Sequence, residues 1–385
     1  MTDSTLTWLH PDGRVGGRGP DGKPVWTRTG VLGDTVVAQG AESVTVPDSP
    51  HRRAPTCPVS DRCGGCDLDR LTTSRRHEAL QAMVARAYRL DDGVVPALVA
   101  SPRATGTRAR VKLAIDHGRV GYRPRRSHDL VAIEACDTAR DELQPVLARL
   151  ASTSLPAGVD TVEVRSDGER VMASFHRPRK GPRQPVGLPE IGVPTALDGR
   201  PVHGDPTLWL SVAGGTLRIS PLSFYQVHLE LNEALVRFVS EQVLAASPER
   251  VLDLYAGVGN LGLVVARTGV PVVAVELEGQ ATADLRHNAA DLPVEVRTGK
   301  VERFDPSTTP FDAVILDPPR AGAGAVVDRV LRNRPKVVVH VACDPVSGAR
   351  DTARGRRAGY RVTEVRCFDL FPQTHHVETV SVWRR

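Results

Sequence analysis

The chain has no long hydrophobic run. Hydrophobic residues make up 41% of its 385 residues, yet no apolar stretch approaches the ~18 residues that a membrane-spanning helix needs. The first residues also lack the basic segment followed by an apolar one that marks a secretory signal. These absences argue against an integral membrane protein and against a secreted one. We therefore expect a cytoplasmic protein of two or three domains that has no membrane partner and acts as a monomer.

Lysine and aromatic residues are scarce. Only 5 of the 50 basic residues are lysine, and Phe, Tyr and Trp together make up 4% of the chain. The net charge of +5 permits a polyanionic partner such as RNA. The excess of arginine is, however, equally typical of a GC-rich coding sequence. Charge alone leaves RNA binding and an ordinary solvated surface equally open.

Cysteines are few and unevenly placed. A cytoplasmic protein is not expected to keep structural disulfides, so clustered cysteines indicate metal or redox chemistry. Five residues separate the first cysteine from the second and two separate the second from the third, while the fourth comes much later. Four thiolates can hold a [4Fe–4S] cluster or a structural zinc ion, and the spacing leaves both open. The six cysteines are Cys57, Cys63, Cys66, Cys136, Cys343 and Cys367.

The front half of the chain reads as two β-rich parts. Residues 1–48 are short apolar pieces split by Gly and Pro, a pattern that predicts strands and tight turns as in a small OB-like barrel. Residues 49–219 hold the first four cysteines and a helix over 70–90, whose apolar residues recur at helical spacing. From residue 94 onward two hairpins are predicted. We expect a central, mainly antiparallel β domain.

The remainder of the chain, 220–385, alternates apolar runs with helical patterns. This alternation predicts a doubly wound, Rossmann-like α/β domain whose ligands bind at the carboxyl ends of the strands. The expected parallel strands are RVLDLYA, VVAVEL, AVILDPP, VVVHVAC and VTEVRCFDL.

A glycine-rich loop follows the first of these strands. Gly257, Gly259 and Gly262 allow a tight turn and close approach to a ligand. The second strand ends at Glu276, 19 residues after Gly257, where a carboxylate can accept hydrogen bonds from both ribose hydroxyls. An adenosine-containing cofactor is therefore expected. The spacing fits S-adenosylmethionine and NAD equally well.

Three reactive side chains stand at the ends of later strands. Asp317 precedes two prolines, Cys343 precedes a predicted helix, and Glu378 interrupts an apolar strand pattern. A helix N-terminus stabilises a thiolate, which would make Cys343 a nucleophile. Each residue also has a purely structural interpretation: Asp317 as a solvated residue that ends a strand, Cys343 as a buried inert thiol, and Glu378 as an edge residue. Taken together, they place a nucleophile and two carboxylates beside a nucleoside cofactor.

Six motifs span residues 220–385: SFYQVH (223–228), DLYAGVGNL (253–261), VELEGQATADLRHNAA (275–290), DPPRAGAG (317–324), ACDPVSGARD (342–351) and DLFPQTHHVE (369–378). In these motifs and in their order, this part of the chain resembles the RNA uracil-5 methyltransferase family. The resemblance implies Cys343 as nucleophile and Glu378 as proton acceptor. It further implies that Gln226, Tyr255, Glu276 and Asp317 line the cofactor and uracil site, and that Gly257, Gly259 and Asn260 form the cofactor loop.

The expected chemistry explains these residue types. Uracil C5 is a poor nucleophile, and addition of the Cys343 thiolate to C6 creates an enolate that can take a methyl group from S-adenosylmethionine at C5. Glu378 then removes the C5 proton, and the thiolate leaves. An ionised Asp317 accepts the uracil N3–H, a group that cytosine lacks. The target base must leave its stack to reach these groups.

The front of the chain resembles the iron–sulfur members of the same family. CPVSDRCGGCDLDRL, with Cys136 in LVAIEAC, implies that Cys57, Cys63, Cys66 and Cys136 hold a [4Fe–4S] cluster with a structural or RNA-positioning role. Residues 1–48 resemble the small RNA-binding barrel called TRAM. This combination favours 23S ribosomal RNA as the substrate, with transfer RNA as the alternative.

Candidate RNA contacts are basic or aromatic, and each also has a structural reading. For the tryptophans a place in the core is the better default. The candidates are Trp8, Trp26, Arg14, Arg18 and Arg28 in the first part and Arg108, Arg110, Lys112, Arg123, Arg125 and Arg126 in the second.

Departures from the family pattern are modest. His228 stands where Asn is common, Tyr225 and Tyr255 where Phe is frequent, and Ala342 where Ser is common. Three rival readings stay open: an NAD-dependent iron–sulfur oxidoreductase, a noncatalytic RNA-binding protein on the same scaffold, and a cytosine-5 methyltransferase, which is disfavoured because its nucleophile follows a different strand.

Overall fold

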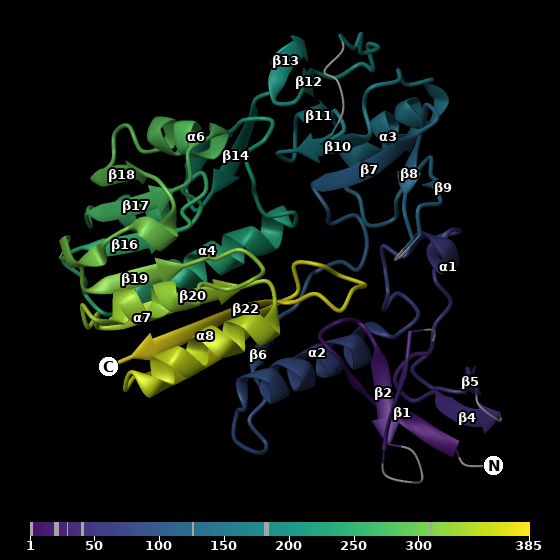
Figure 1. The fold of residues 1–385 in the computed structure, drawn as a ribbon, viewed down its shortest axis with the longest axis horizontal. Coiled ribbons are helices and arrows are strands. Elements are labelled where there is room, and N and C mark those ends of the chain that lie inside the picture. The colour runs from purple at the N-terminus through teal and green to yellow at the C-terminus, as the bar shows by residue number, and fades with distance from the viewer. Residues whose placement is uncertain are drawn as a thin grey trace.

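A computed structural model of the chain describes residues 3–18, 23–28, 30–39, 42–124, 127–180, 185–308 and 310–385. Two of the candidate RNA contacts, Arg125 and Arg126, lie outside these ranges. Three larger sheets and one hairpin make up the β-structure of the described residues, and the part from residue 220 onward lies opposite the two front parts (Figure 1). No helix in these ranges is both long and apolar enough to cross a membrane.

The first sheet is antiparallel and has the strand order β3-β2-β1-β4-β5. Its two outer strands approach each other where the hydroxyl oxygens of Thr27 and Thr45 lie 3.4 Å apart, so the sheet curls. The predicted strands are confirmed, and the predicted OB-like barrel stays a prediction. The strands are β1 (Asp3–Leu9), β2 (Val15–Arg18), β3 (Pro24–Thr27), β4 (Thr35–Gln39) and β5 (Glu42–Val46).

The second sheet has the order β13-β12-β11-β10-β7-β8-β9 and is mainly antiparallel, as predicted; only β11 and β12 run parallel. Both predicted hairpins, β7–β8 and β10–β11, are present. Its strands are β7 (Arg110–Asp116), β8 (Arg119–Tyr122), β9 (Val131–Ala132), β10 (Thr161–Ser166), β11 (Val171–His176), β12 (Thr195–Leu197) and β13 (Arg200–His203). A separate hairpin pairs β14 (Leu208–Val212) with β15 (Gly215–Ile219).

The third sheet has eight strands in the order β18-β17-β16-β19-β20-β22-β21-β6. Its first five strands are parallel, and β22 runs antiparallel to both of its neighbours. The strands are β16 (Val251–Leu254), β17 (Val272–Glu276), β18 (Val294–Thr298), β19 (Ala313–Leu316), β20 (Val337–Ala342), β21 (Arg361–Phe368), β22 (Glu378–Arg384) and β6 (Ala97–Val99).

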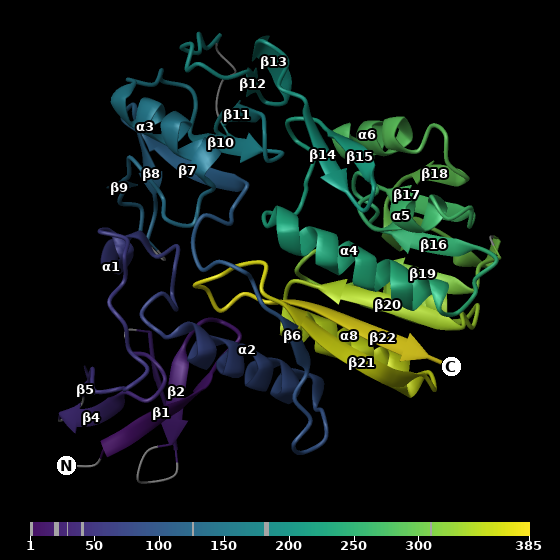
Figure 2. The ribbon, with the colours of Figure 1, turned by 180° about the vertical axis from the view of Figure 1, so that it is seen from behind.

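Helices cover both faces of this sheet. Successive residues of a strand point to opposite faces of the sheet, and in β16 both faces are buried. Val251 packs in one core with α4 and α5, whereas Leu252 packs in another core with α7. Figure 1 shows α8 in front of the sheet, and Figure 2, seen from behind, shows α4 on the opposite face, the doubly wound arrangement that was predicted. The helices of this part are α4 (Leu229–Leu244), α5 (Gly262–Ala266), α6 (Gln280–Asn288), α7 (Ala325–Leu331) and α8 (Pro345–Arg357).

The front of the chain also contributes a strand to this third sheet, called the catalytic sheet below. The predicted helix is present as α2 (Thr73–Tyr88), which packs on α8, and β6 pairs in parallel with β21. Cys367, the cysteine that belongs to no motif, lies in β21 and is fully buried in the core that α2 shares with the first sheet. Two short helices, α1 (Ser60–Cys63) and α3 (Gln144–Ser152), complete the described helices apart from short 3-10 turns.

Candidate active site

One pocket lies at the carboxyl ends of the parallel strands, where the sequence placed it. Phe371, Pro318 and Pro319 form part of its wall. Gly259 is the predicted site residue that does not line it. The predicted residues that line this pocket are Gln226, Tyr255, Gly257, Asn260, Glu276, Asp317, Cys343 and Glu378.

The glycine loop after β16 has an unusual backbone. Tyr255, Gly257 and Gly259 have φ values of 64°, 58° and 96°, a region that L side chains rarely adopt. A Cβ atom on Gly259 would lie 2.4 Å from the Leu263 side chain. Gly259 therefore shapes the loop from inside, by packing close to α5, and does not face the pocket.

Two polar pairs fix the loop on either side. A Glu276 carboxylate oxygen accepts a hydrogen bond from the Gly257 N–H at 2.8 Å, which ties the end of β17 to the loop. Asn260 and Asn232 exchange reciprocal amide hydrogen bonds of 2.8 and 2.9 Å. Because these side chains are already held, the pocket edge that faces a nucleoside is preorganised.

Buried carboxyl groups converge at the base of the pocket. Burial and the nearby Asp317 raise the pKa of Asp253 to about 8. Burial and Glu276 raise the pKa of Asp317 to about 7. Glu378 is 2% exposed, and burial together with Asp317 raises its pKa well above its ordinary value. The ligand-free pocket thus holds protons at neutral pH that a bound cation would displace.

Cys343 lies between the end of β20 and the N-terminus of α8. Asp344 caps this helix by accepting hydrogen bonds from the N–H groups of Val346 and Ser347 at 3.0 and 2.9 Å. The helix was expected to stabilise the thiolate. Burial and the neighbouring Glu378 raise the pKa of Cys343 to about 12 in the ligand-free pocket, because these effects outweigh the nearby Arg320.

Several pocket residues were not assigned from the sequence. Phe224 is 52% exposed and carries the Arg110 guanidinium 4.8 Å above its ring, which places one candidate RNA contact at the pocket. Phe371 comes from the loop before β22. Both lie in the quoted motifs SFYQVH and DLFPQTHHVE, so an aromatic residue within a motif that also holds a predicted site residue was the available signal.

The departure at His228 has a structural explanation. Its Nδ1 accepts a hydrogen bond from the Leu231 N–H at 3.3 Å and so caps α4, and its Nε2 lies 2.8 Å from the Ser101 hydroxyl. The side chain is fully buried and absent from the pocket lining. The substitution therefore changes a helix cap and leaves the reacting groups in place.

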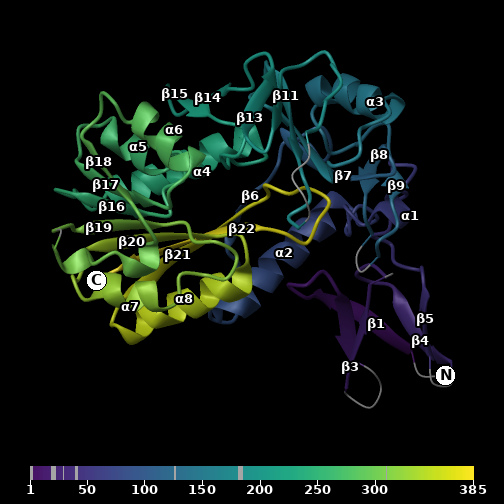
Figure 3. The same ribbon diagram turned by 45° about the horizontal axis from the view of Figure 1, so that its top comes forward.

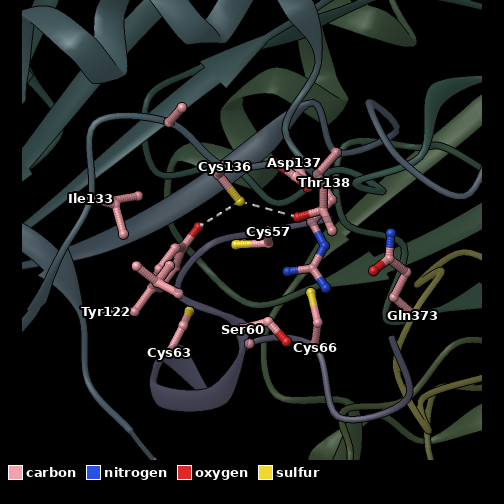
Figure 4. A pocket seen from close by; sticks show the side chains of 14 residues that line it. Cys57, Ser60, Cys63, Cys66, Tyr122, Ile133, Cys136, Asp137, Thr138 and Gln373 are labelled. Carbon is pink, nitrogen blue, oxygen red and sulfur yellow. Dashed lines mark hydrogen bonds between the residues drawn. The ribbon is translucent and has the colours of Figure 1, made fainter. Parts of the chain in front are cut away.

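A second pocket gathers the four clustered cysteines. Figure 4 shows the Cys57, Cys63, Cys66 and Cys136 thiols pointing into one space. The Cys136 sulfur accepts a hydrogen bond from the Tyr122 hydroxyl at 3.6 Å. Burial raises the pKa of Cys66 to about 12. Within the described ranges, no three His, Cys, Asp or Glu side chains are placed to hold one metal ion.

Comparison with known proteins identifies the family. A family model described as "tRNA (Uracil-5-)-methyltransferase" matches residues 296–385, and one described as "Conserved hypothetical protein 95" matches residues 231–335. The chain is 31% identical to a 23S rRNA (uracil(1939)-C(5))-methyltransferase RlmD from Pectobacterium atrosepticum, over 87% of this chain and 81% of that one. The chain belongs to the RNA uracil-5 methyltransferase family. It is therefore a class I, S-adenosylmethionine-dependent RNA methyltransferase.

A further relative agrees with this assignment, and a solved structure has the same fold. An uncharacterized RNA methyltransferase from Streptomyces avermitilis is 32% identical over 95% of this chain and 94% of its own. The crystal structure of the Pyrococcus abyssi tRNA (uracil-54, C5)-methyltransferase in complex with S-adenosyl-L-homocysteine superposes with a TM-score of 0.77, at 24% identity and over 100% of both chains. This likeness confirms the methyltransferase fold. Family membership leaves the oxidoreductase and noncatalytic readings without support.

Proposed function

We propose that this enzyme methylates C5 of a uridine in RNA, with Cys343 as the nucleophile and Glu378 as the base. The observation that carries the proposal is the convergence of Cys343, Asp317 and Glu378 on the pocket that also holds Glu276 and the glycine loop. These side chains come from three different strand ends and the segment after β20. A purely structural role would not require them to share one pocket.

Each side chain then has a task in the reaction. The Cys343 thiolate adds to uracil C6, which leaves an enolate with electron density at C5. S-adenosylmethionine supplies a methyl group bound to a cationic sulfonium, and C5 takes that methyl. Glu378 removes the C5 proton, the C5–C6 double bond forms again, and the thiolate leaves. Asp317 as a carboxylate accepts the uracil N3–H.

The raised pKa values define when this site becomes reactive. In the ligand-free pocket, burial raises the pKa of Cys343 to about 12 and raises the pKa of Glu378 well above its ordinary value, which favours the protonated form of each. A cation held among the carboxyl groups favours their ionised forms and lowers these pKa values. The residues that would hold the cofactor are Gln226, Tyr255, Gly257, Asn260, Glu276 and Asp317, with Gly259 shaping the loop.

The reacting residues are tested by two substitutions. Cys343→Ala is expected to abolish methyl transfer to RNA while S-adenosylmethionine binding persists. Glu378→Gln is expected to accumulate a covalent protein–RNA adduct that survives denaturing electrophoresis, because the C5 proton stays in place. Retained turnover in the first variant would remove Cys343 from the nucleophile role, and normal product release in the second would remove Glu378 from the base role.

The proposed substrate is 23S ribosomal RNA, with transfer RNA as the alternative. Support comes from the 23S rRNA methyltransferases among the relatives, several of which are at least 30% identical to this chain. Mapping of 5-methyluridine in both RNAs from a deletion strain decides between them: loss from ribosomal RNA supports the proposal, and loss from transfer RNA alone overturns it.

The first sheet offers aromatic and basic groups that suit an RNA strand. Trp8 and Trp26 are half-buried with ring centroids 5.8 Å apart, and the Arg14 guanidinium lies 5.2 Å from the Trp26 ring. Stacked bases and phosphates bind such groups. We propose a TRAM-like unit at 1–48, a cysteine and central β unit at 49–219, and the catalytic unit at 220–385.

For the cysteine pocket we propose a [4Fe–4S] cluster held by Cys57, Cys63, Cys66 and Cys136. Zinc needs all its sulfur ligands at ~2.3 Å from one point, whereas in a cluster each thiolate binds a different iron, so the sulfurs stay farther apart. The second arrangement fits thiols that share a pocket without gathering around one ion. Anaerobically purified protein should be brown and carry about four irons; a colourless protein with one zinc would refute the cluster.

A further inference from the structure

The loop between β21 and β22 connects the active site to residues 57–69, which hold Cys57, Cys63 and Cys66 and are called the cysteine segment here. It covers residues 369–377, contributes Phe371 to the pocket wall and ends directly before Glu378, the proposed base. In Figures 1 and 3 this yellow loop reaches beyond the catalytic sheet toward α2 and the front of the chain. Its position therefore depends on partners outside the catalytic sheet.

One of these partners is Asp67, which directly follows Cys66. One Asp67 carboxylate oxygen accepts a hydrogen bond from the His375 N–H at 3.0 Å, although 308 residues separate the two in sequence. The other oxygen bonds to Nδ1 of the same histidine. The next residue, Leu68, donates its N–H to the Gln373 carbonyl at 2.9 Å. Three hydrogen bonds thus join two consecutive residues of the cysteine segment to the loop.

The junction at which Asp67 and Leu68 bond to His375 and Gln373 is tightly packed. His375 is 3% exposed. Gly13, from the turn between β1 and β2, lies against it, since a Cβ atom there would come within 2.5 Å of an Asp67 oxygen and 2.7 Å of His375 Nδ1. The first sheet, the cysteine segment and the catalytic loop therefore meet at one point.

From His375, contacts continue to the active-site wall. The His375 and His376 rings lie 4.0 Å apart, and the His376 ring meets the Phe371 ring edge-on at 5.9 Å. Thr374 closes the loop by donating its hydroxyl to the Phe371 carbonyl at 2.8 Å and accepting the His376 N–H at 3.2 Å. A displacement of His375 is thereby carried to Phe371 and to the chain that precedes Glu378.

On its other side the junction adjoins the cysteine pocket. Gln373 is one of the residues that line this pocket, and its amide donates a hydrogen bond to the Ala104 carbonyl at 2.8 Å. Its φ of 67° is unusual for a residue other than glycine, so the surrounding contacts must hold it. The loop thus has one face on the cysteine pocket and the other on the active site.

We propose that Asp67 and His375 form a positioning clamp, which uses the ordered cysteine segment to hold Glu378 and Phe371 against the substrate uracil. This inference rests on the proposed function of Glu378. It assigns the cysteine pocket a mechanical part in catalysis, since the segment that carries Cys66 also carries Asp67. Misplacement of a catalytic group by about 1 Å can slow a reaction roughly 100-fold, so a few hydrogen bonds suffice for such an effect.

The test compares Asp67→Ala, which removes both acceptor oxygens, with Asp67→Asn, which keeps one acceptor for the His375 N–H. Asp69→Asn is the matched control, because Asp69 lies in the same segment and its carboxylate accepts a hydrogen bond from Ser60. For Asp67→Ala we expect kcat to fall roughly 10- to 100-fold with KM for RNA and affinity for S-adenosylmethionine within about twofold. Asp67→Asn should recover most of this loss.

Two further readouts separate positioning from a general loss of structure. Backbone hydrogen exchange of peptides covering 371–378 should become faster in Asp67→Ala than in the wild type and stay unchanged in Asp69→Asn. Each variant is compared with the wild type twice, with the cysteine pocket loaded and after chelation. On normal RNA, Asp67→Ala should accumulate the covalent adduct, as expected for Glu378→Gln, because proton removal is the step that slows. If Asp67→Ala does not fold, His375→Ala, which keeps the backbone donor, should show the same effects more weakly.

The outcomes distinguish the clamp from the proposed function. Wild-type protein should form a stable adduct with RNA that carries 5-fluorouridine, because the C–F bond leaves no proton to remove. Absence of that adduct in the wild type would overturn the proposed function itself. Its presence, with Asp67→Ala equal to the wild type in kcat and exchange, would overturn the clamp alone. Equal losses in Asp67→Ala and Asp69→Asn would likewise overturn it.

Discussion

Replacement of Asp253 by Asn should stabilise the ligand-free enzyme, and more so at higher pH. Asp253 is 1% exposed at the end of β16; one carboxyl oxygen accepts the Gly262 N–H at 3.1 Å and the other has no hydrogen-bond partner among the described residues. Burial, with the nearby Asp317, raises its pKa from 3.8 to about 8. The asparagine oxygen can still accept the Gly262 hydrogen bond.

The magnitude follows from proton linkage. Between pH 3.8 and 8 the unfolded chain has ionised Asp253 while the folded protein keeps the proton, so stability falls by about 1.4 kcal/mol per pH unit. Asparagine does not titrate. The gain in the free energy of unfolding of Asp253→Asn over the wild type should therefore grow by about 3 kcal/mol from pH 5.5 to 7.5. For a catalytic unit of this size, that corresponds to about 5–10 °C in Tm.

Thermal unfolding of the ligand-free protein, followed by circular dichroism at both pH values and constant ionic strength, measures this difference. Asp312→Asn is the control of opposite sign: burial opposes ionisation there, but hydrogen bonds from Lys336, Arg250 and Glu249 lower the pKa of Asp312. That variant should lose stability. A Tm difference between Asp253→Asn and wild type that is equal at pH 5.5 and 7.5, or that shrinks with pH, would refute the reasoning.

Two further predictions concern charge. As pH rises from 6 to 8, Asp317 ionises through its pKa of about 7 and attracts the sulfonium cation of S-adenosylmethionine. The affinity for S-adenosylmethionine should therefore rise at least about threefold relative to the affinity for S-adenosylhomocysteine, whose sulfur is uncharged. Calorimetry at both pH values measures this, and a ratio of the two affinities that does not change with pH would contradict it. Arg76 of α2 makes a bidentate pair with buried Asp369 at 2.7 and 2.5 Å. Arg76→Ala should lower the free energy of unfolding by about 3–5 kcal/mol in urea titration, since a buried charge loses its partner; a loss below about 1 kcal/mol would be inconsistent with that burial.

Much of the fold is visible in the sequence because parallel strands are buried on both faces and so appear as continuous apolar runs. This pattern located β16, β17, β19 and β20 and hence the pocket at their carboxyl ends. It did not reveal the antiparallel direction of β22 or the addition of β6. Strand direction depends on pairing partners far away in the chain, and apolar periodicity is the same in either direction.

The site was predicted where local geometry determines it and missed where distant groups do. Glycines after β16 indicated a loop at the cofactor pocket, yet only packing against Leu263 shows that Gly259 turns inward. The helix after Cys343 is visible in the sequence, whereas the burial and the Glu378 charge that raise its pKa come from other segments. The contact of Asp67 with His375 follows no local pattern at all.

The placement of β6 has a consequence for how the molecule is made. Residues 97–99 pair with the edge strand 366–368, so a strand synthesised early waits for nearly the whole chain before it gains its partner. Contacts of such long sequence separation form slowly and leave the backbone N–H and C=O groups along that side of β21 unpaired in the meantime. A fragment that begins at residue 220 would keep this side of β21 unpaired permanently, as a template on which another strand can add.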